Sequence, residues 1–338
     1  MKRTLISLFL ALAMLLSFAA CTGGAQKPAE TAAPATAVTE SAAQPVDDYK
    51  LKIGSLKGPT GMGMAKLIND NKTSGAYNIE LYGAPTDITA ALVNGSLDVA
   101  AVPVNLAAVI NKKTNGDYLV AAVNTLGVLY ILENGNTLTS LSDLEGKTLY
   151  ATGQGSTPEY MLNYILEKNG LKDKVTVEWK ADHGELATLL ASGDVSFAML
   201  PEPFVTTTLA KNSAIRTVVD LTEEWKKTGE GMAVQGCIVV SKNVIENHKA
   251  LLDTFLNEYL ASVGFVNGNV PEAAAMIAEL GIVASAAVAE KAIPRCNIVF
   301  IDGDDMVGIL NAFYTVLYNA DPSSVGGTLP SEALYYKK

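Results

Sequence analysis

The chain has 338 residues, 49% of them hydrophobic and 18% charged, and its formal net charge is -10. This apolar content excludes a disordered chain, and the acidic balance argues against a nucleic-acid partner, which needs a basic face. Three cysteines are too few for a disulfide-built scaffold, and His183 and His248 show no zinc-site spacing. We therefore expect no metal site, no catalytic constellation and no cofactor, in a chain long enough for roughly two domains.

The first twenty residues are typical of an export signal. Lys2 and Arg3 precede an apolar run over residues 5–18, which is short for a transmembrane helix. Two alanines then precede Cys21, which resembles the lipobox of bacterial lipoproteins, although Phe18 stands where leucine is usual. The resemblance implies removal of residues 1–20 and a lipid anchor on Cys21; ordinary signal cleavage with an incidental Cys21 is the alternative.

A segment of small and polar residues follows the cysteine. Residues 22–48 consist largely of Ala, Thr, Pro, Gly, Gln and Glu, with Val38 and Val46 as the only bulky apolar side chains. Such a segment cannot bury enough apolar surface to offset the entropy lost on ordering. We therefore predict a disordered tether over residues 21–48, between a membrane anchor and a globular body.

The globular body is predicted from residue 49 onward, as strands alternating with helices. Its first part contains a strand at 51–54, a glycine-rich turn at 58–61, helices at 62–69 and 87–93, and a strand at 98–102 that stops at Pro103. Strands that alternate with helices indicate an α/β architecture with largely parallel strands.

The same order of elements recurs about 98 residues later. A strand at 148–151, a turn at 153–158, helices at 159–168 and 185–191, and a strand at 195–200 follow one another. Gly95 and Pro103 lie 98 residues before Gly193 and Pro201. We interpret this as two similar lobes, the alternative being the periodicity common to all α/β units.

Two such lobes predict a shared cleft. Ligands of open parallel sheets bind beyond the carboxyl ends of the strands, where the glycine-rich and proline-containing loops of each lobe lie. If the lobes face each other, these loops converge, and two helix N-termini would favour an anionic or hydrogen-bond-accepting group there.

Five segments in order resemble one family of transport proteins. They are Lys52-Ile53-Gly54-Ser55-Leu56-Lys57-Gly58-Pro59-Thr60-Gly61-Met62, the segment 87–100, Leu144-Glu145-Gly146-Lys147-Thr148, Leu200-Pro201-Glu202-Pro203-Phe204, and Gly326-Gly327-Thr328-Leu329-Pro330. Together they are similar to ABC-transporter substrate-binding lipoproteins of the nitrate/sulfonate/taurine type, the NMT1/THI5-like group, across about residues 50–335. No single motif is specific, but their shared order is.

The resemblance implies a two-lobed, periplasmic-binding-protein-like fold (type II) with a ligand cleft between the lobes. Lobe 1 would comprise residues 49–140 plus 238–338, and lobe 2 residues 141–237. It also implies a monomer, anchored to the extracytoplasmic face of the membrane, that delivers a small polar solute such as a sulfonate or an aminopyrimidine to an ABC permease. An enzyme on the same fold, of a pyrimidine or menaquinone pathway, is the alternative.

Polar and turn residues at the loop ends are the candidate ligand contacts. They are Lys57, Thr60, Gly61, Pro103, Asn105 and Thr125 from lobe 1, Gln154, Ser156, Thr157 and Glu202 from lobe 2, and Gln235 at the return crossing. Glu202 lies between two prolines and would favour an amine or a ring N–H, which together with the helix N-termini suggests a solute bearing both features. For Ser156 and Thr157 the alternative role is helix capping, for Lys57 a solvated position, and for Glu202 a cap or a hinge ion pair.

Overall fold

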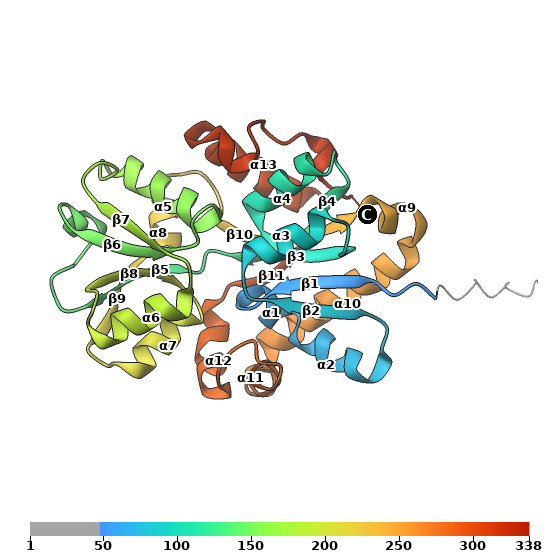
Figure 1. The fold of residues 1–338 in the computed structure, drawn as a ribbon, viewed down its shortest axis with the longest axis horizontal. Helices are drawn as coiled ribbons and strands as arrows, with labels where there is room; N and C mark the ends of the chain where they lie inside the picture. Colours follow the sequence, from blue (N-terminus) through green and yellow to red (C-terminus); the bar gives the residue numbers. More distant parts are fainter. Residues whose placement is uncertain (1–47, 338) are drawn as a thin grey trace, which may run out of the picture. The chain divides into compact units, whose positions relative to one another are not determined.

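Two β-sheets, each flanked by helices, form the part of the chain that the computed structural model describes, residues 48–337 (Figure 1). The predicted signal, Cys21 and the tether up to residue 47 lie outside these residues. Within residues 48–337, no helix combines the length and the apolar character needed to span a membrane.

Lobe 1 is built on a six-stranded sheet in the order β11-β4-β10-β3-β1-β2. Its strands are β1 (Lys52–Leu56), β2 (Asn78–Tyr82), β3 (Val99–Pro103), β4 (Tyr118–Leu126), β10 (Val234–Ser241) and β11 (Ile298–Ile301). One face is covered by α3 (Pro85–Val93), α4 (Val104–Lys113) and α13 (Gly303–Ala320). The other is covered by α1 (Pro59–Gly63), α2 (Ala65–Ser74), α10 (Lys249–Gly268), α11 (Val270–Glu279) and α12 (Ala286–Ala292).

Lobe 2 is built on a five-stranded sheet in the order β7-β6-β8-β5-β9. Its strands are β5 (Leu129–Asn134), β6 (Thr148–Thr152), β7 (Thr176–Lys180), β8 (Phe197–Pro201) and β9 (Ile215–Asp220). Helices α5 (Thr157–Lys168) and α8 (Leu221–Lys227) pack on one face, and α6 (His183–Ser192) and α7 (Phe204–Lys211) on the other. The remaining helices are α9 (Lys242–Asn247), η1 (Leu141–Leu144), η2 (Ile293–Arg295), η3 (Pro322–Val325) and η4 (Glu332–Leu334).

The predicted internal repeat is confirmed by the topology of the sheets. β1 pairs in parallel with β2 and β3, and β6 pairs in parallel with β7 and β8. In each lobe the third strand of the repeat then pairs with one antiparallel strand: β3 pairs with β10, and β8 pairs with β5. Because β5 and β10 adjoin the two crossings of the chain, each lobe is completed by a strand at a crossing.

The chain changes lobe earlier than predicted at both crossings. It leaves the first sheet after Leu126 and enters the second at Leu129, whereas the boundary was placed at residue 140. It returns to the first sheet at Val234 and not at residue 238. The motif at Leu144 set the predicted boundary, but it lies in η1 next to β6, and β5 before it is already paired with β8 and β9.

Local details also differ from the sequence-based expectation. The helix predicted at 62–69 is two helices separated at Met64, and Gly61 and Gly63 both lie in the first. Glycine lowers helix propensity, yet a β-carbon at Gly63 would lie 2.9 Å from the Ile298 side chain, so close packing requires it. Cys237 and Cys296 are both free and buried, and they belong to hydrophobic clusters on opposite faces of the first sheet.

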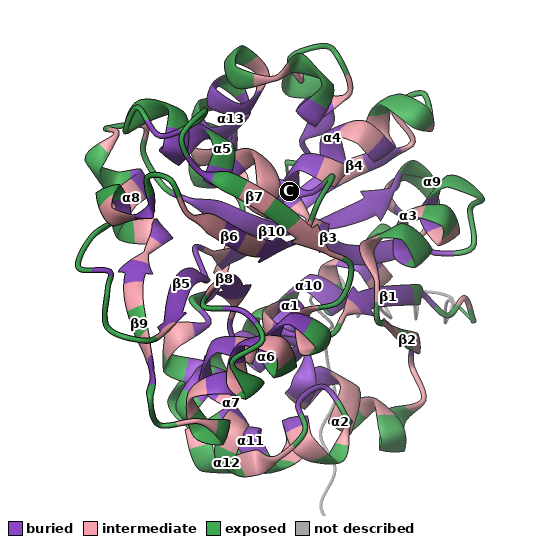
Figure 2. Ribbon diagram, turned by 60° about the vertical axis from the view of Figure 1, so that its left-hand side comes forward, coloured by how far each residue is buried: buried purple, intermediate pink, exposed green. Residues whose placement is uncertain are grey.

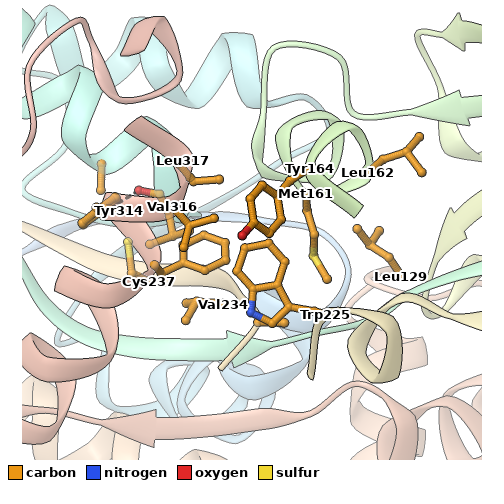
Figure 3. Close-up of a cluster of buried hydrophobic side chains, with 14 of the residues drawn as sticks. Leu129, Met161, Leu162, Tyr164, Trp225, Val234, Cys237, Tyr314, Val316 and Leu317 are labelled. Carbon is orange, nitrogen blue, oxygen red and sulfur yellow. Dashed lines mark hydrogen bonds between the residues drawn. The ribbon is translucent and has the colours of Figure 1, made fainter. Parts of the chain in front are cut away.

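One hydrophobic cluster continues from lobe 1 into lobe 2. In it the fully buried Trp225 of α8 has its ring centroid 5.2 Å from that of Tyr164 on α5 and 5.1 Å from that of Phe313 on α13 (Figure 3). Figure 2 shows the central strands of the sheets largely buried, the edge strands β2 and β7 more exposed, and the outward faces of the helices exposed. Residues 48–337 thus form one compact unit, with the lobes joined by apolar packing as well as by the two crossings.

Candidate functional site

Two predicted site residues from different lobes meet in a buried contact. Asn105 lies in the first turn of α4, just after β3, and Thr157 is the first residue of α5, which follows β6. The Thr157 hydroxyl donates to Asn105 Oδ1 at 3.0 Å, and the Asn105 N–H donates to Thr157 Oγ1 at 3.3 Å. The loops at the carboxyl ends of the two sheets therefore converge as the sequence predicts.

A second contact between the lobes involves Gln235, the predicted residue at the return crossing. It lies in β10 with its side chain nearly buried, and its Nε2 donates to the thioether sulfur of Met161 on α5 at 3.0 Å. Asn105, Thr157 and Gln235 are thus held by partners from the opposite lobe. Separation of the lobes would break these contacts, while Asn105 Nδ2 would keep its hydrogen bond to Ser324 O within lobe 1.

The third contact between the lobes is an ion pair of Glu202 and Arg295. Glu202 follows β8 and is 0% exposed, and its Oε1 lies 2.9 Å from Nε of Arg295 on η2 of lobe 1. Its Oε2 accepts from the Thr206 N–H at 3.1 Å. The Arg295 guanidinium also lies over the ring of Tyr130 on β5, 4.7 Å from its centroid.

Burial dominates the electrostatics of this pair. Desolvation raises the pKa of Glu202, while Arg295 and the hydrogen bond from Thr206 partly offset the rise. A buried carboxylate needs a cation or several donors to remain ionised. Here Arg295 supplies the cation. In this conformation Glu202 therefore forms an ion pair between the lobes, which is the alternative role that the sequence suggested beside binding an amine of the solute.

Two predicted contacts, Lys57 and Gln154, lie on exposed positions. Lys57 directly follows β1, and its backbone N–H donates to Tyr82 O at 3.0 Å while its side chain is exposed. Gln154 lies in the turn between β6 and α5. The structure therefore brings neither side chain into the buried contacts between the lobes.

Four further predicted residues shape the backbone around the junction. The Thr60 hydroxyl donates to Leu56 O at 2.9 Å, and the Ser156 hydroxyl donates to Gly153 O at 2.7 Å. Ser156 occupies the N-cap of α5 but makes no side-chain capping bond there. Pro103 ends β3 and is the N-cap residue of α4, and Gly61 allows close packing, since a β-carbon there would lie 2.8 Å from Leu56 O.

Thr125, the last predicted residue, belongs to a group of buried side chains that lack hydrogen-bond partners. Its Oγ1 has none, and neither do Oδ1 and Nδ2 of Asn124 or the hydroxyl of Tyr259. Burial raises the pKa of Tyr259 well above its ordinary value, and the adjacent Asn124 only partly offsets this. Asn124, Tyr259 and Arg295 are absent from the predicted contacts, because no motif marks these positions along the chain.

His183 lies beside the carboxyl end of β6. Its Nδ1 is 2.6 Å from the Thr152 hydroxyl, and its ring packs against Phe204. Burial lowers the pKa of His183 to about 4, so the imidazole is neutral at physiological pH. Among residues 48–337, no three His, Cys, Asp or Glu side chains are grouped closely enough to hold a metal ion.

Three surface hollows of the described residues lie away from the predicted contacts. The largest of three, about 590 Å³, is bordered by α5, the loop at Gly229–Gly231 and α13. The others are bordered by the ends of α3 and α4 and by the C-terminal segment. None of the three is lined by any of the eleven predicted ligand residues.

The comparisons with known proteins agree with this geometry. The model of a family described as "ABC transporter, phosphonate, periplasmic substrate-binding protein" matches residues 72–291. The chain belongs to this family. No curated protein matches the sequence of this substrate-binding protein. The sequence-based expectation of an ABC substrate-binding protein is therefore confirmed.

Solved structures show the same fold at low sequence identity. An ABC transporter protein from Parabacteroides distasonis is 24% identical with a TM-score of 0.73, over 86% of this chain and 100% of its own. The alkanesulfonate-binding protein SsuA of Xanthomonas axonopodis pv. citri, bound to MOPS, is 17% identical with a TM-score of 0.65, over 83% and 94%. The periplasmic aliphatic sulphonate-binding protein SsuA of Escherichia coli is 15% identical with a TM-score of 0.68, over 85% and 92%. The predicted two-lobed fold is confirmed.

Proposed function

We propose that this substrate-binding protein captures a small polar solute between its two lobes, outside the cytoplasm, and delivers it to an ABC permease. The observation that carries the proposal is the buried contact of Asn105 with Thr157, because it joins the ligand-side loops of both sheets. A solute that replaces such contacts stabilises the closed arrangement of the lobes. The closed form then docks on the permease as a monomer without catalysis.

The solute class we propose is an organic molecule with an oxyanion or a ring nitrogen group. The family model carries a phosphonate description, and two structural neighbours are named for sulfonates. The sequence motifs favour the nitrate/sulfonate/taurine group of binding proteins. That resemblance adds aminopyrimidines to the candidate solutes. We further propose that Cys21 carries a lipid, so that the protein is held at the extracytoplasmic face of the membrane.

A thermal-shift screen followed by an uptake assay tests this function. Methylphosphonate, taurine, an aminopyrimidine and nitrate are each added to the purified protein. A solute that binds only the folded protein at about 100 times its Kd raises the free energy of unfolding by about 2.7 kcal/mol. Cells that lack the protein should then lose uptake of that solute and regain it when the gene is restored.

The controls separate transport from binding alone. Asn105→Ala removes one side of the contact between the lobes and should weaken both binding and uptake. Thr315→Val changes an exposed position on the far end of α13 and should alter neither. Tight binding with unimpaired uptake in the deletion strain would show that delivery to a permease is not the role of this protein.

A further inference from the structure

Three uncharged side chains in lobe 1 lie close together. Asn124 and Thr125 lie in the last three residues of β4, and Tyr259 belongs to α10, which packs on the same sheet. A β-carbon at Gly236 would lie 2.6 Å from Asn124 Oδ1 and 3.3 Å from Thr125 Oγ1. One at Gly63 would lie 3.2 Å from the Tyr259 hydroxyl. Asn124 approaches that hydroxyl closely enough to lower its pKa, but the two groups do not meet in hydrogen-bond geometry.

All four polar atoms of this group are buried and unpaired. Asn124 and Tyr259 are 0% exposed and Thr125 is 2% exposed, and none of their side-chain oxygens or nitrogens has a hydrogen-bond partner in the part of the chain described. Proteins leave few buried polar atoms unpaired, because each costs the loss of its hydration. Here four unpaired polar atoms lie in one place, beside the junction where Thr60 and Gly236 also lie. We infer that their hydrogen-bond partner comes from outside the chain.

We propose that Asn124, Thr125 and Tyr259 form a subsite for an uncharged end of the solute, a group with a hydrogen-bond donor beside an acceptor, such as a carboxamide or a lactam. The inference rests on the proposed function and specifies which chemistry lobe 1 recognises. Gly236 and Gly63 keep side-chain bulk away from this group, since a β-carbon at either position would crowd it.

The chemistry of the three side chains favours an uncharged group of the solute over a charged one. Both ends of the Asn124 amide are unpaired, so a donor and an acceptor are needed whichever end is oxygen. Burial raises the pKa of Tyr259, so its hydroxyl stays protonated. An oxyanion would satisfy the donors but would leave the amide oxygen of Asn124 unpaired against negative charge.

The stability of the solute-free protein gives the first test. Thr125→Val and Tyr259→Phe each remove a hydroxyl that has no partner, so neither should lower the Tm, and a rise is expected. The matched controls are Thr208→Val and Tyr314→Phe, whose buried hydroxyls donate to Phe204 O at 2.7 Å and to Val104 O at 2.8 Å. Each control should lower the Tm by about 2–4 °C.

The binding arm uses isothermal titration of cytosine, nicotinamide, taurine and methylphosphonate against the same four variants and the unmodified protein. Cytosine or nicotinamide should bind more tightly than the two oxyanions. Thr125→Val and Tyr259→Phe should each weaken that binding about tenfold or more, and the two controls should leave it unchanged.

Two results would overturn the subsite. One is a loss of Tm in Thr125→Val and Tyr259→Phe equal to that of the controls, which would mean that water or the side chains themselves satisfy these groups. The other is a solute that binds the unmodified protein, Thr125→Val and Tyr259→Phe with the same affinity. That result would exclude the subsite but would leave the proposed function intact. If none of the four probes binds, the Tm comparison still decides the subsite, whereas unimpaired uptake of a bound solute in the deletion strain would count against the proposed function alone.

Discussion

At the scale of single residues, Glu202 shows how burial redirects a side chain that a motif singles out. The sequence suggests a carboxylate aimed at an amine of the solute, because it stands between two prolines after an apolar strand. In the fold this carboxylate is fully buried and is paired with Arg295 from the other lobe. A buried ion pair adds little net stability, but removal of one partner leaves the other charge unpaired.

The raised pKa of Glu202 predicts a specific dependence of stability on pH. A carboxyl whose pKa is higher in the folded state contributes stability below its ordinary value of 4.5 and loses it as the pH rises through the raised value. Glu202→Gln should therefore flatten the curve of unfolding free energy above pH 4.5. Denaturant titrations at several pH values measure this.

Arg295→Met provides the opposing variant. Loss of the guanidinium removes the charge that lowers the pKa of Glu202, so the decline of stability should extend to higher pH and become larger in total. Parallel curves for the unmodified protein and Glu202→Gln would show that this carboxyl does not titrate differently in the folded and unfolded states.

At the scale of elements, the first turns of α4 and α5 carry the contact between the lobes. Each helix follows a parallel strand, β3 or β6, that ends at the junction. Residues at such a turn project toward the ends of the strands, which is why Asn105 and Thr157 meet although 52 residues separate them. The contact depends on the shared topology of the two sheets.

Thr157→Val tests the strength of this contact. Valine preserves the shape of threonine but cannot hydrogen-bond, so Oδ1 and the backbone N–H of Asn105 lose their partner, while Asn105 Nδ2 keeps its bond to Ser324 O. We expect a loss of about 1–2 kcal/mol in the free energy of unfolding, measured by denaturant titration. Thr315→Val makes the same change on an exposed face of α13 and should cost much less. Equal losses in the two variants would mean that the contact adds no stability.

At the scale of the whole molecule, two repeated lobes share one hydrophobic cluster as well as the polar junction. Trp225 packs between Tyr164 of lobe 2 and Phe313 of lobe 1, so relative movement of the lobes must accommodate this packing (Figure 3). The proposed delivery to a permease additionally requires that the body stay near the membrane, a role we assign to Cys21 and residues 21–48.

Cys21→Ser tests the proposed anchor. Serine cannot form the thioether to lipid, so the variant should move from the membrane fraction of cells to the soluble or secreted fraction, as measured by immunoblot. Cys237→Ala removes a buried thiol of the core and should remain with the membrane. A membrane-bound Cys21→Ser variant would exclude lipidation at this residue as the anchor.

Much of the fold is predictable from the sequence because it depends on local patterns. The alternation of strands and helices, the 98-residue repeat and the convergence of two proline- and glycine-containing loops all follow from residue spacing, and the sheets confirm them. The crossings were misplaced because the motif at Leu144 set the first boundary, and no sequence signal shows that β5 already belongs to the second sheet or that the start of β10 belongs to the first. Only their partners, β8 and β3, show which lobe each completes.

The sequence by itself determined the two-lobed architecture, the broad class of ABC substrate-binding proteins and the loops that carry the candidate site, since periodicity and motif order record these directly. Tertiary structure alone decided which side chains are already partnered and which are not. Glu202 is neutralised by an arginine 93 positions away, whereas Asn124, Thr125 and Tyr259 are left unpaired. Hydrogen bonding and desolvation depend on neighbours brought together by folding, and such neighbours leave no pattern along the chain.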